Sequence, residues 1–201
     1  MLLTLKATAQ KDPQAVKILD KFSATALNAP SVSMEFDLIT YDQSKQSSDT
    51  LKGSAVISNN KYKLDLPDNT IWFNGEISWS YLPAEKEVTL TKPGKNEEVF
   101  QSKPSSIFTM YKKGYKIRMI DETGNYYIID LYPEDLKSNL IHVRLSISKS
   151  SLALKDLEYK QKDGITRKLI VKKYDLSKKP DPSLFIYPKD KFKGVEVIDM
   201  R

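Results

Sequence analysis

The feature that most constrains the fold is a change of hydrophobic period after Pro30. Before this proline, residues 12–27 carry apolar side chains at helical spacing, with Asp12 as a cap and Pro13 in the first turn. After it, residues 32–38 alternate strictly between apolar and polar side chains, which is the period of a strand with one exposed face. The chain is therefore predicted to begin with one amphipathic helix and to continue as antiparallel sheet.

The rest of the chain reads as short strands separated by turn residues. Asn59-Asn60, Asn74-Gly75 and Asp163-Gly164 are typical hairpin turns, and Pro104 opens a short predicted helix over 105–111. Further strands are predicted at 51–66, 71–73, 77–81, 88–90, 115–120, 126–132, 141–148, 155–161, 166–174, 181–188 and 195–200. These patterns predict a mainly β (α+β) fold, a strongly curved antiparallel sheet of about ten or eleven strands, with helices on one face. We expect residues 10–201 to form a single domain.

Composition excludes several classes of function. The chain of 201 residues has no cysteine and one histidine, His142, so thiolate catalysis, zinc sites and a Ser-His-Asp triad are not expected. Its net charge of +6 comes almost entirely from lysines scattered along the chain, and not from a concentrated arginine footprint of the kind that binds nucleic acid. With only seven glycines there is no phosphate-binding loop. We expect no catalysis, cofactor, metal or nucleic-acid partner.

The N-terminus resembles the end of a secretory signal. Residues 1–9 combine an apolar patch with Ala7-Thr8-Ala9, the small-residue pattern of a cleavage site. A remnant of a signal peptide implies export to the periplasm. An ordinary N-terminal tail is the alternative, because the basic region is missing and Lys6 interrupts the apolar patch.

Large apolar side chains accumulate on one predicted face of the sheet. Phe36, Leu38, Leu64, Trp79 and Tyr81 are expected to share this face, with only two helices available to cover it. Part of the face should then remain as an open apolar cavity, the usual form of a ligand site. Complete closure of the core by curvature and the two helices is the alternative.

The hairpin stretch Gly75–Pro83, GEISWSYLP, resembles the D-G-x-x-x-W-x-Y-x-P hairpin of the LolA-like outer-membrane lipoprotein carriers. The other pieces follow in the family's order: an S-x-x-x-F-like strand at Ser31–Phe36, a strand pair opening at Gly53, and the Pro-then-apolar segment Pro104–Met110. The tail Ser183–Asp199 is similar to the family's F-x-F-x-P-P-x-G-V-x-V ending. The resemblance covers roughly residues 12 to 200.

The resemblance implies an unclosed antiparallel half-barrel with a helical lid. Such carriers hold acylated lipoproteins noncovalently, collect them from an inner-membrane ABC transporter and release them at the outer membrane, where a receptor is a further possible partner. It also implies a monomer. The acyl chains are then expected to contact apolar residues of the helices and of the sheet: Phe22, Ile107, Phe108 and Met110, and Phe36, Leu38, Leu64, Trp79 and Tyr81.

The sequence departs from the family pattern at two places. Asn59-Asn60 stands where many members have an Arg-Pro pair whose arginine bonds to the lid, and Lys189 follows Pro188 where a second proline is usual. A divergent carrier fits these departures. An envelope lipid-sensing or protein-interaction domain on the same half-barrel is the alternative, and carbohydrate binding through Trp72 and Trp79 is a third hypothesis. The face on which Trp72 lies is left open.

Overall fold

Helix α1 (Pro13–Asn28) forms where the helical period predicts it. Asp12 caps it, since its Oδ1 accepts hydrogen bonds from the backbone N–H of Gln14 at 2.9 Å and of Ala15 at 3.1 Å. The helix ends at Asn28, with Ala29 as its C-cap directly before Pro30, and one stripe of its side chains is buried. The predicted helix is thereby confirmed.

The computed structural model of the protein describes residues 11–92 and 103–201, and its strands form one sheet. The strands are β1 Val32–Asp42, β2 Ser47–Ser58, β3 Lys61–Asp65, β4 Thr70–Phe73, β5 Ser78–Leu82, β6 Glu87–Thr91, β7 Tyr115–Asp121, β8 Tyr126–Pro133, β9 Leu140–Ser148, β10 Leu154–Gln161, β11 Ile165–Asp175 and β12 Glu196–Asp199. Their order is β12-β6-β5-β4-β3-β2-β1-β11-β10-β9-β8-β7. Neighbours are antiparallel except β12, which runs parallel to β6. The predicted mainly β, unclosed sheet is confirmed, with twelve strands in the described residues.

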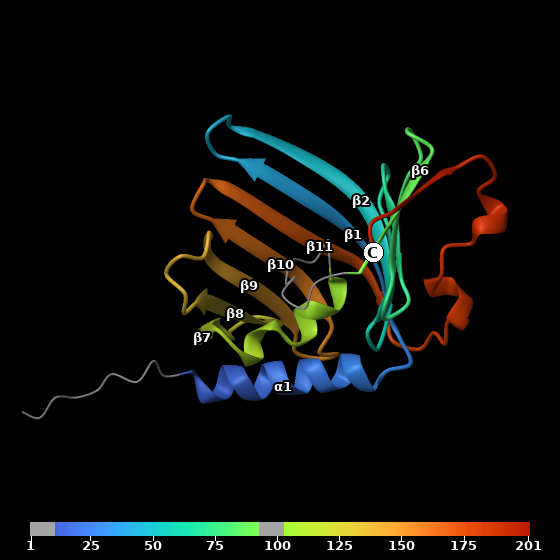
Figure 1. The fold of residues 1–201 in the computed structure, drawn as a ribbon. Helices are drawn as coiled ribbons and strands as arrows, with labels where there is room; N and C mark the ends of the chain where they lie inside the picture. Colours follow the sequence, from blue (N-terminus) through green and yellow to red (C-terminus); the bar gives the residue numbers. More distant parts are fainter. Residues whose placement is uncertain (1–10, 93–102) are drawn as a thin grey trace, which may run out of the picture.

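The sheet consists of two meanders joined by the pairing of β1 with β11. Figure 1 shows β7–β11 on one side and the strands around β6 on the other, with β1 and β2 curving between them. A register shift between Glu35 and Phe36 marks an irregularity in the β1–β11 pair. The curvature gives the sheet a concave face and an outer face.

Three helical segments lie on the concave face, and we call them the lid: α1 and the 3₁₀ helices η1 (Pro104–Phe108) and η2 (Met110–Lys112). The single short helix predicted at 105–111 is thus two 3₁₀ turns. Lys103 occupies the cap position of η1 without a side-chain cap, and Pro104 takes the first helical position. In the described residues no helix has both the length and the apolar character needed to cross a membrane.

Residues 178–195 between β11 and β12 lie on the outer face, and we call them the C-terminal segment. Residues 181–188, predicted as a strand, instead begin with the 3₁₀ helix η3 (Pro182–Phe185), because the Asp181 carboxylate accepts the backbone N–H of Ser183 at 2.8 Å and Pro182 fits the first helical position. A second turn, η4 (Lys189–Lys191), leads to β12. Figure 1 shows this segment, in red, on the opposite side of β3–β6 from the lid.

Gly53 is required where β2 passes the ring of Phe36. A Cβ built on Gly53 would lie 2.7 Å from Cζ of Phe36 and 2.8 Å from Cδ2 of Leu66, closer than carbon atoms approach in proteins. We expect Gly53→Ala to lower the free energy of unfolding by about 1–3 kcal/mol through overpacking. Urea unfolding followed by circular dichroism measures the change. Gly124→Ala is the control, because nothing lies within 4 Å of its Cβ position; equal stability of the two variants would contradict the prediction.

Candidate functional site

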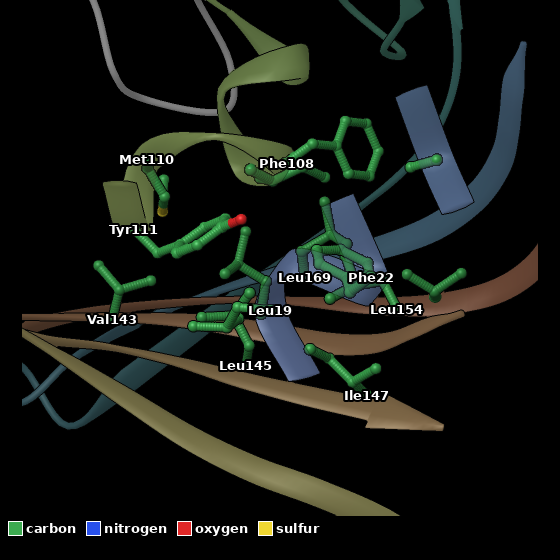
Figure 2. Packing of buried hydrophobic residues seen from close by; sticks show 14 of the residues in the cluster. Leu19, Phe22, Phe108, Met110, Tyr111, Val143, Leu145, Ile147, Leu154 and Leu169 are labelled. Carbon is green, nitrogen blue, oxygen red and sulfur yellow. The ribbon is translucent and has the colours of Figure 1, made fainter. Parts of the chain in front are cut away.

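The concave face and the lid share one continuous apolar cluster. Phe22 of α1 and Phe108 of η1 meet with ring centroids 5.5 Å apart, and both side chains are buried. Figure 2 shows Phe108 of η1 and Met110 and Tyr111 of η2 gathered with Leu19 and Phe22 of α1, above the strand residues Val143 and Leu145. The lid therefore occupies the apolar face that a ligand on this side of the sheet would use.

A hydrogen bond joins the two parts of the lid. The hydroxyl of Tyr111 in η2 donates to Oδ1 of Asp20 in α1 at 2.6 Å. Burial, together with the nearby Asp20 carboxylate, raises the pKa of Tyr111 to about 12, so the phenol keeps its proton throughout the neutral range.

The start of α1 is fixed to β7 through Asp12. Its backbone N–H donates to the carbonyl oxygen of Ile117 at 3.0 Å, and its Oδ2 accepts from the N–H of Met119 at 3.3 Å. Backbone hydrogen bonds, that from Ala15 foremost, hold the pKa of Asp12 below its ordinary value. One carboxylate thus both caps the helix and anchors it to the sheet.

We expect Asp12→Ala to cost about 1–2 kcal/mol of stability at pH 7, the usual cost of losing a helix cap. Because the folded pKa is lowered, this stabilisation is present above the unfolded pKa of about 3.9 and is lost as pH falls through the folded value. Thermal unfolding at pH 7 and pH 3 measures both effects. A deficit that stays the same at pH 3 would contradict the assignment.

The structure brings seven of the nine predicted acyl-binding residues into the lid–sheet cluster. These residues are at most 5% exposed: Phe22, Phe36, Leu38, Leu64, Ile107, Phe108 and Met110. The side chains expected to line an open cavity are therefore covered by the lid in this closed form. Binding of a ligand to them requires the lid to move.

Trp79 and Tyr81 lie on the other face of the sheet, so their predicted placement beside Leu64 is wrong. Leu64 pairs with Ile71, whereas Trp79 pairs with Trp72, which faces away from that pair. In each hairpin an even-numbered residue pairs with an odd-numbered one. The residues that point inward are therefore even-numbered in one strand and odd-numbered in the next. The open question about Trp72 is answered by the same register: it lies beside Trp79 on the outer face.

On the inner side of β5 and β6 the side chains are polar except Leu82 at the end of β5. Ser78 pairs with Thr91 and Ser80 with Thr89 on this side, and Ser80 donates a hydrogen bond to Asn69 at 3.1 Å. The apolar side of the sheet therefore changes from the concave to the outer face at β4. Sequence reasoning could have found this by following the register through the Asn74-Gly75 hairpin.

The departure from the family pattern at Asn59-Asn60 falls in a turn. Asn59 has a positive φ of 54° in the β2–β3 connection, and Asn60 donates to the carbonyl oxygen of Gly75 at 3.5 Å. Both residues are exposed. Asn60 thus links two neighbouring hairpin turns, whereas Asn59 only shapes its own turn. The hydrogen bond between η2 and α1 comes instead from Tyr111 and Asp20, and it could not be predicted from the sequence.

Groups that could support other chemistry are few in the described residues. There, no three His, Asp or Glu side chains gather to hold a metal ion. His142 lies on the outer face of β9, with Nε2 3.6 Å from a carboxylate oxygen of Glu158 and its ring against Tyr132. Trp72 is 4% exposed, so its faces are not available for stacking against a sugar ring.

Comparisons with known proteins show what the chain is similar to. The family model described as outer membrane lipoprotein carrier protein LolA matches residues 5–164. An uncharacterized conserved protein from Thermus thermophilus is 12% identical, with a TM-score of 0.62 over 92% of this chain and 99% of that chain. A LolA superfamily protein from Nitrosomonas europaea is 14% identical, with a TM-score of 0.47 over 87% of this chain and 98% of that chain. No curated protein sequence matches the chain.

Proposed function

Because the chain belongs to the family of outer membrane lipoprotein carrier proteins LolA, we propose that it carries lipoproteins by binding their acyl chains between lid and sheet. The observation that carries the proposal is the cluster in which Phe22, Ile107 and Phe108 of the lid cover Phe36 and Leu64 of the sheet. If the lid moves away, this face offers a continuous apolar surface to the chains.

A lid that competes with the ligand suits a carrier better than an open cavity. Each methylene group removed from water contributes about 0.8 kcal/mol, so a permanently open site for several acyl chains would release them very slowly. Displacing the lid exposes its own buried residues to water, and that cost is subtracted from the binding free energy. Return of the lid then favours release.

The remaining parts of the proposal follow from the family. We infer that the protein works in the periplasm, takes its cargo from an inner-membrane ABC transporter and delivers it toward the outer membrane, with a receptor there as a further candidate partner. It acts as a monomer and as a carrier, so no bond is made or broken. The predicted signal remnant at residues 1–9 lies outside the described residues and stays a prediction.

Binding of a triacylated lipopeptide tests the proposal directly. The purified protein should form a 1:1 complex with the lipopeptide in native mass spectrometry, and the lipopeptide should displace a fluorescent fatty-acid probe on titration. The same peptide without its acyl chains is the matched control and should not bind. Equal binding of the two peptides, or none of either, would refute the carrier proposal; equal binding would favour a protein-interaction domain.

A further inference from the structure

A second apolar cluster lies on the outer face, separate from the lid–sheet cluster. We call it the outer cluster, and its members come from β4, β5, β6 and the C-terminal segment: Trp72, Trp79, Tyr81, Val88, Leu90, Tyr187, Phe192 and Val195. Both tryptophans of the chain belong to it. Trp72, Val88 and Tyr187 are buried, although the sheet alone would leave this face in water.

Aromatic rings form the centre of the outer cluster. Phe192 contacts Tyr81, Tyr187 and Trp72 with ring centroids 4.6, 5.2 and 5.8 Å apart, respectively. Trp72 also meets Tyr187 edge to face at 5.4 Å. These contacts are those of a small core, and they hold the C-terminal segment against β4 and β5.

The C-terminal segment does not fill the space above Trp72. A cavity of about 620 Å³ remains there, within the range of small-molecule sites. Its apolar lining includes Trp72, Leu184, Tyr187 and Phe192. Its polar lining comes from four further side chains: Lys63, Asp181, Ser183 and Lys191. An apolar floor with a few polar groups at the edge is the arrangement that binds an amphiphilic molecule.

The charge at this edge favours an anion. Residues 178–194 contain five lysines and two aspartates, a net charge of +3, and one of these lysines, Lys178, pairs with Asp175 at 3.9 Å. Among the described residues, no carboxylate forms an ion pair with Lys191, whereas Lys63 pairs with Asp65 at 2.8 Å. The Asp181 carboxylate is already bonded to the backbone N–H of Ser183. Of the two lysines in the cavity lining, Lys191 is therefore the one available to an anion.

We propose that this cavity is a second ligand site, which binds a single-chain anionic amphiphile. The carboxylate or phosphate head lies at Lys191, and the apolar chain lies against the lining side chains of Leu184, Ile186, Tyr187 and Phe192, above the buried Trp72. The site is on the opposite face from the acyl site proposed above. It can be occupied whether or not the lid is open.

Intrinsic tryptophan fluorescence tests the proposal, because both tryptophans lie in the outer cluster. The probes are three dodecyl amphiphiles used below their critical micelle concentrations: dodecyl phosphate, dodecyl maltoside and dodecyltrimethylammonium. We expect a saturable emission change with dodecyl phosphate at concentrations at least tenfold lower than with the neutral and cationic probes. Laurate in place of dodecyl phosphate tells whether the site prefers a carboxylate or a phosphate head.

Lys191→Glu should weaken binding of dodecyl phosphate at least threefold. Lys179→Glu makes the same change of charge in the same exposed segment but lies outside the cavity lining, so it should bind like the wild type. Equal affinity for all three probes, an equal effect of the two variants, or no emission change would overturn the proposal. Lipopeptide binding that leaves tryptophan emission unchanged tests the acyl site alone, so the two proposals can fail independently.

Discussion

Replacing Arg144 with leucine should lower the free energy of unfolding by about 2–3 kcal/mol at pH 7, because the Asp130 carboxylate is buried while the Arg144 side chain is 37% exposed, which places the loss at or below the low end of the range for a fully buried ion pair. Asp130 on β8 has a side chain that is 0% exposed, although it lies on the outer face. Its two carboxylate oxygens accept hydrogen bonds from Nε and Nη2 of Arg144 on β9, each at 2.7 Å. Without Arg144, this carboxylate stays buried with only the Tyr132 hydroxyl, 3.0 Å away, as a side-chain donor.

The pH dependence gives this prediction a second readout. Burial alone would raise the pKa of Asp130, but the hydrogen bonds from Arg144 and Tyr132 outweigh it, so the pKa lies below its ordinary value. The stabilisation is thus present above the unfolded pKa of about 3.9 and is lost as pH falls through the folded one. In Arg144→Leu the pKa of Asp130 should rise, so the gap in stability between wild type and variant should narrow from pH 7 to pH 3.

Lys173→Leu is the matched control, because it breaks an ion pair that is open to water. Lys173 lies 3.0 Å from Glu35, and both side chains are more than half exposed. Exposed pairs contribute less than about 1 kcal/mol. Urea unfolding of the three proteins at pH 7 and pH 3 separates the two cases. Similar losses of unfolding free energy in both variants would contradict the prediction, because the pair with the buried Asp130 would then stabilise no more than an exposed pair.

The helix and most strands could be predicted from the sequence because their signals are local. The cap at Asp12, the stop at Pro30 and the alternation in β1 each depend on a few neighbouring residues. The inward direction of the seven candidate residues in the lid–sheet cluster could be predicted for the same reason, since spacing within one element decides which way a side chain points, whereas their binding of acyl chains stays a prediction.

What the sequence did not reveal depends on contacts between distant elements. The outward direction of Trp79 follows from the register of the successive hairpins that lead to β5, and one shift of register reverses the face of every side chain in a strand. The position of Phe192 over Tyr81 and the bond from Tyr111 to Asp20 join residues far apart in the chain. No local pattern predicts such pairs. The apolar residues between the lysines of the C-terminal segment indicate only that this segment packs against some part of the sheet.

Replacing Tyr111 with phenylalanine should raise the affinity for an acyl probe about fivefold. The variant keeps the buried ring and loses only the hydroxyl that bonds to Asp20 at 2.6 Å. A hydrogen bond of this kind, to a carboxylate on an exposed residue, contributes about 1 kcal/mol net. If the acyl site is available only when the lid is open, the apparent dissociation constant falls as the open fraction rises. Titration with a fluorescent fatty acid measures it.

Tyr132→Phe separates an effect on the lid from a general loss of stability. It also removes a tyrosine hydroxyl bonded to an aspartate, Asp130, but on the outer face of the sheet and not in the lid–sheet cluster. Both variants should lose a similar amount of stability, while only Tyr111→Phe should bind the probe more tightly. If Tyr132→Phe gained affinity as well, looser packing in general would explain the result. If Tyr111→Phe bound more weakly, the hydroxyl would belong to the acyl site itself, and the competition between lid and ligand would lose its support.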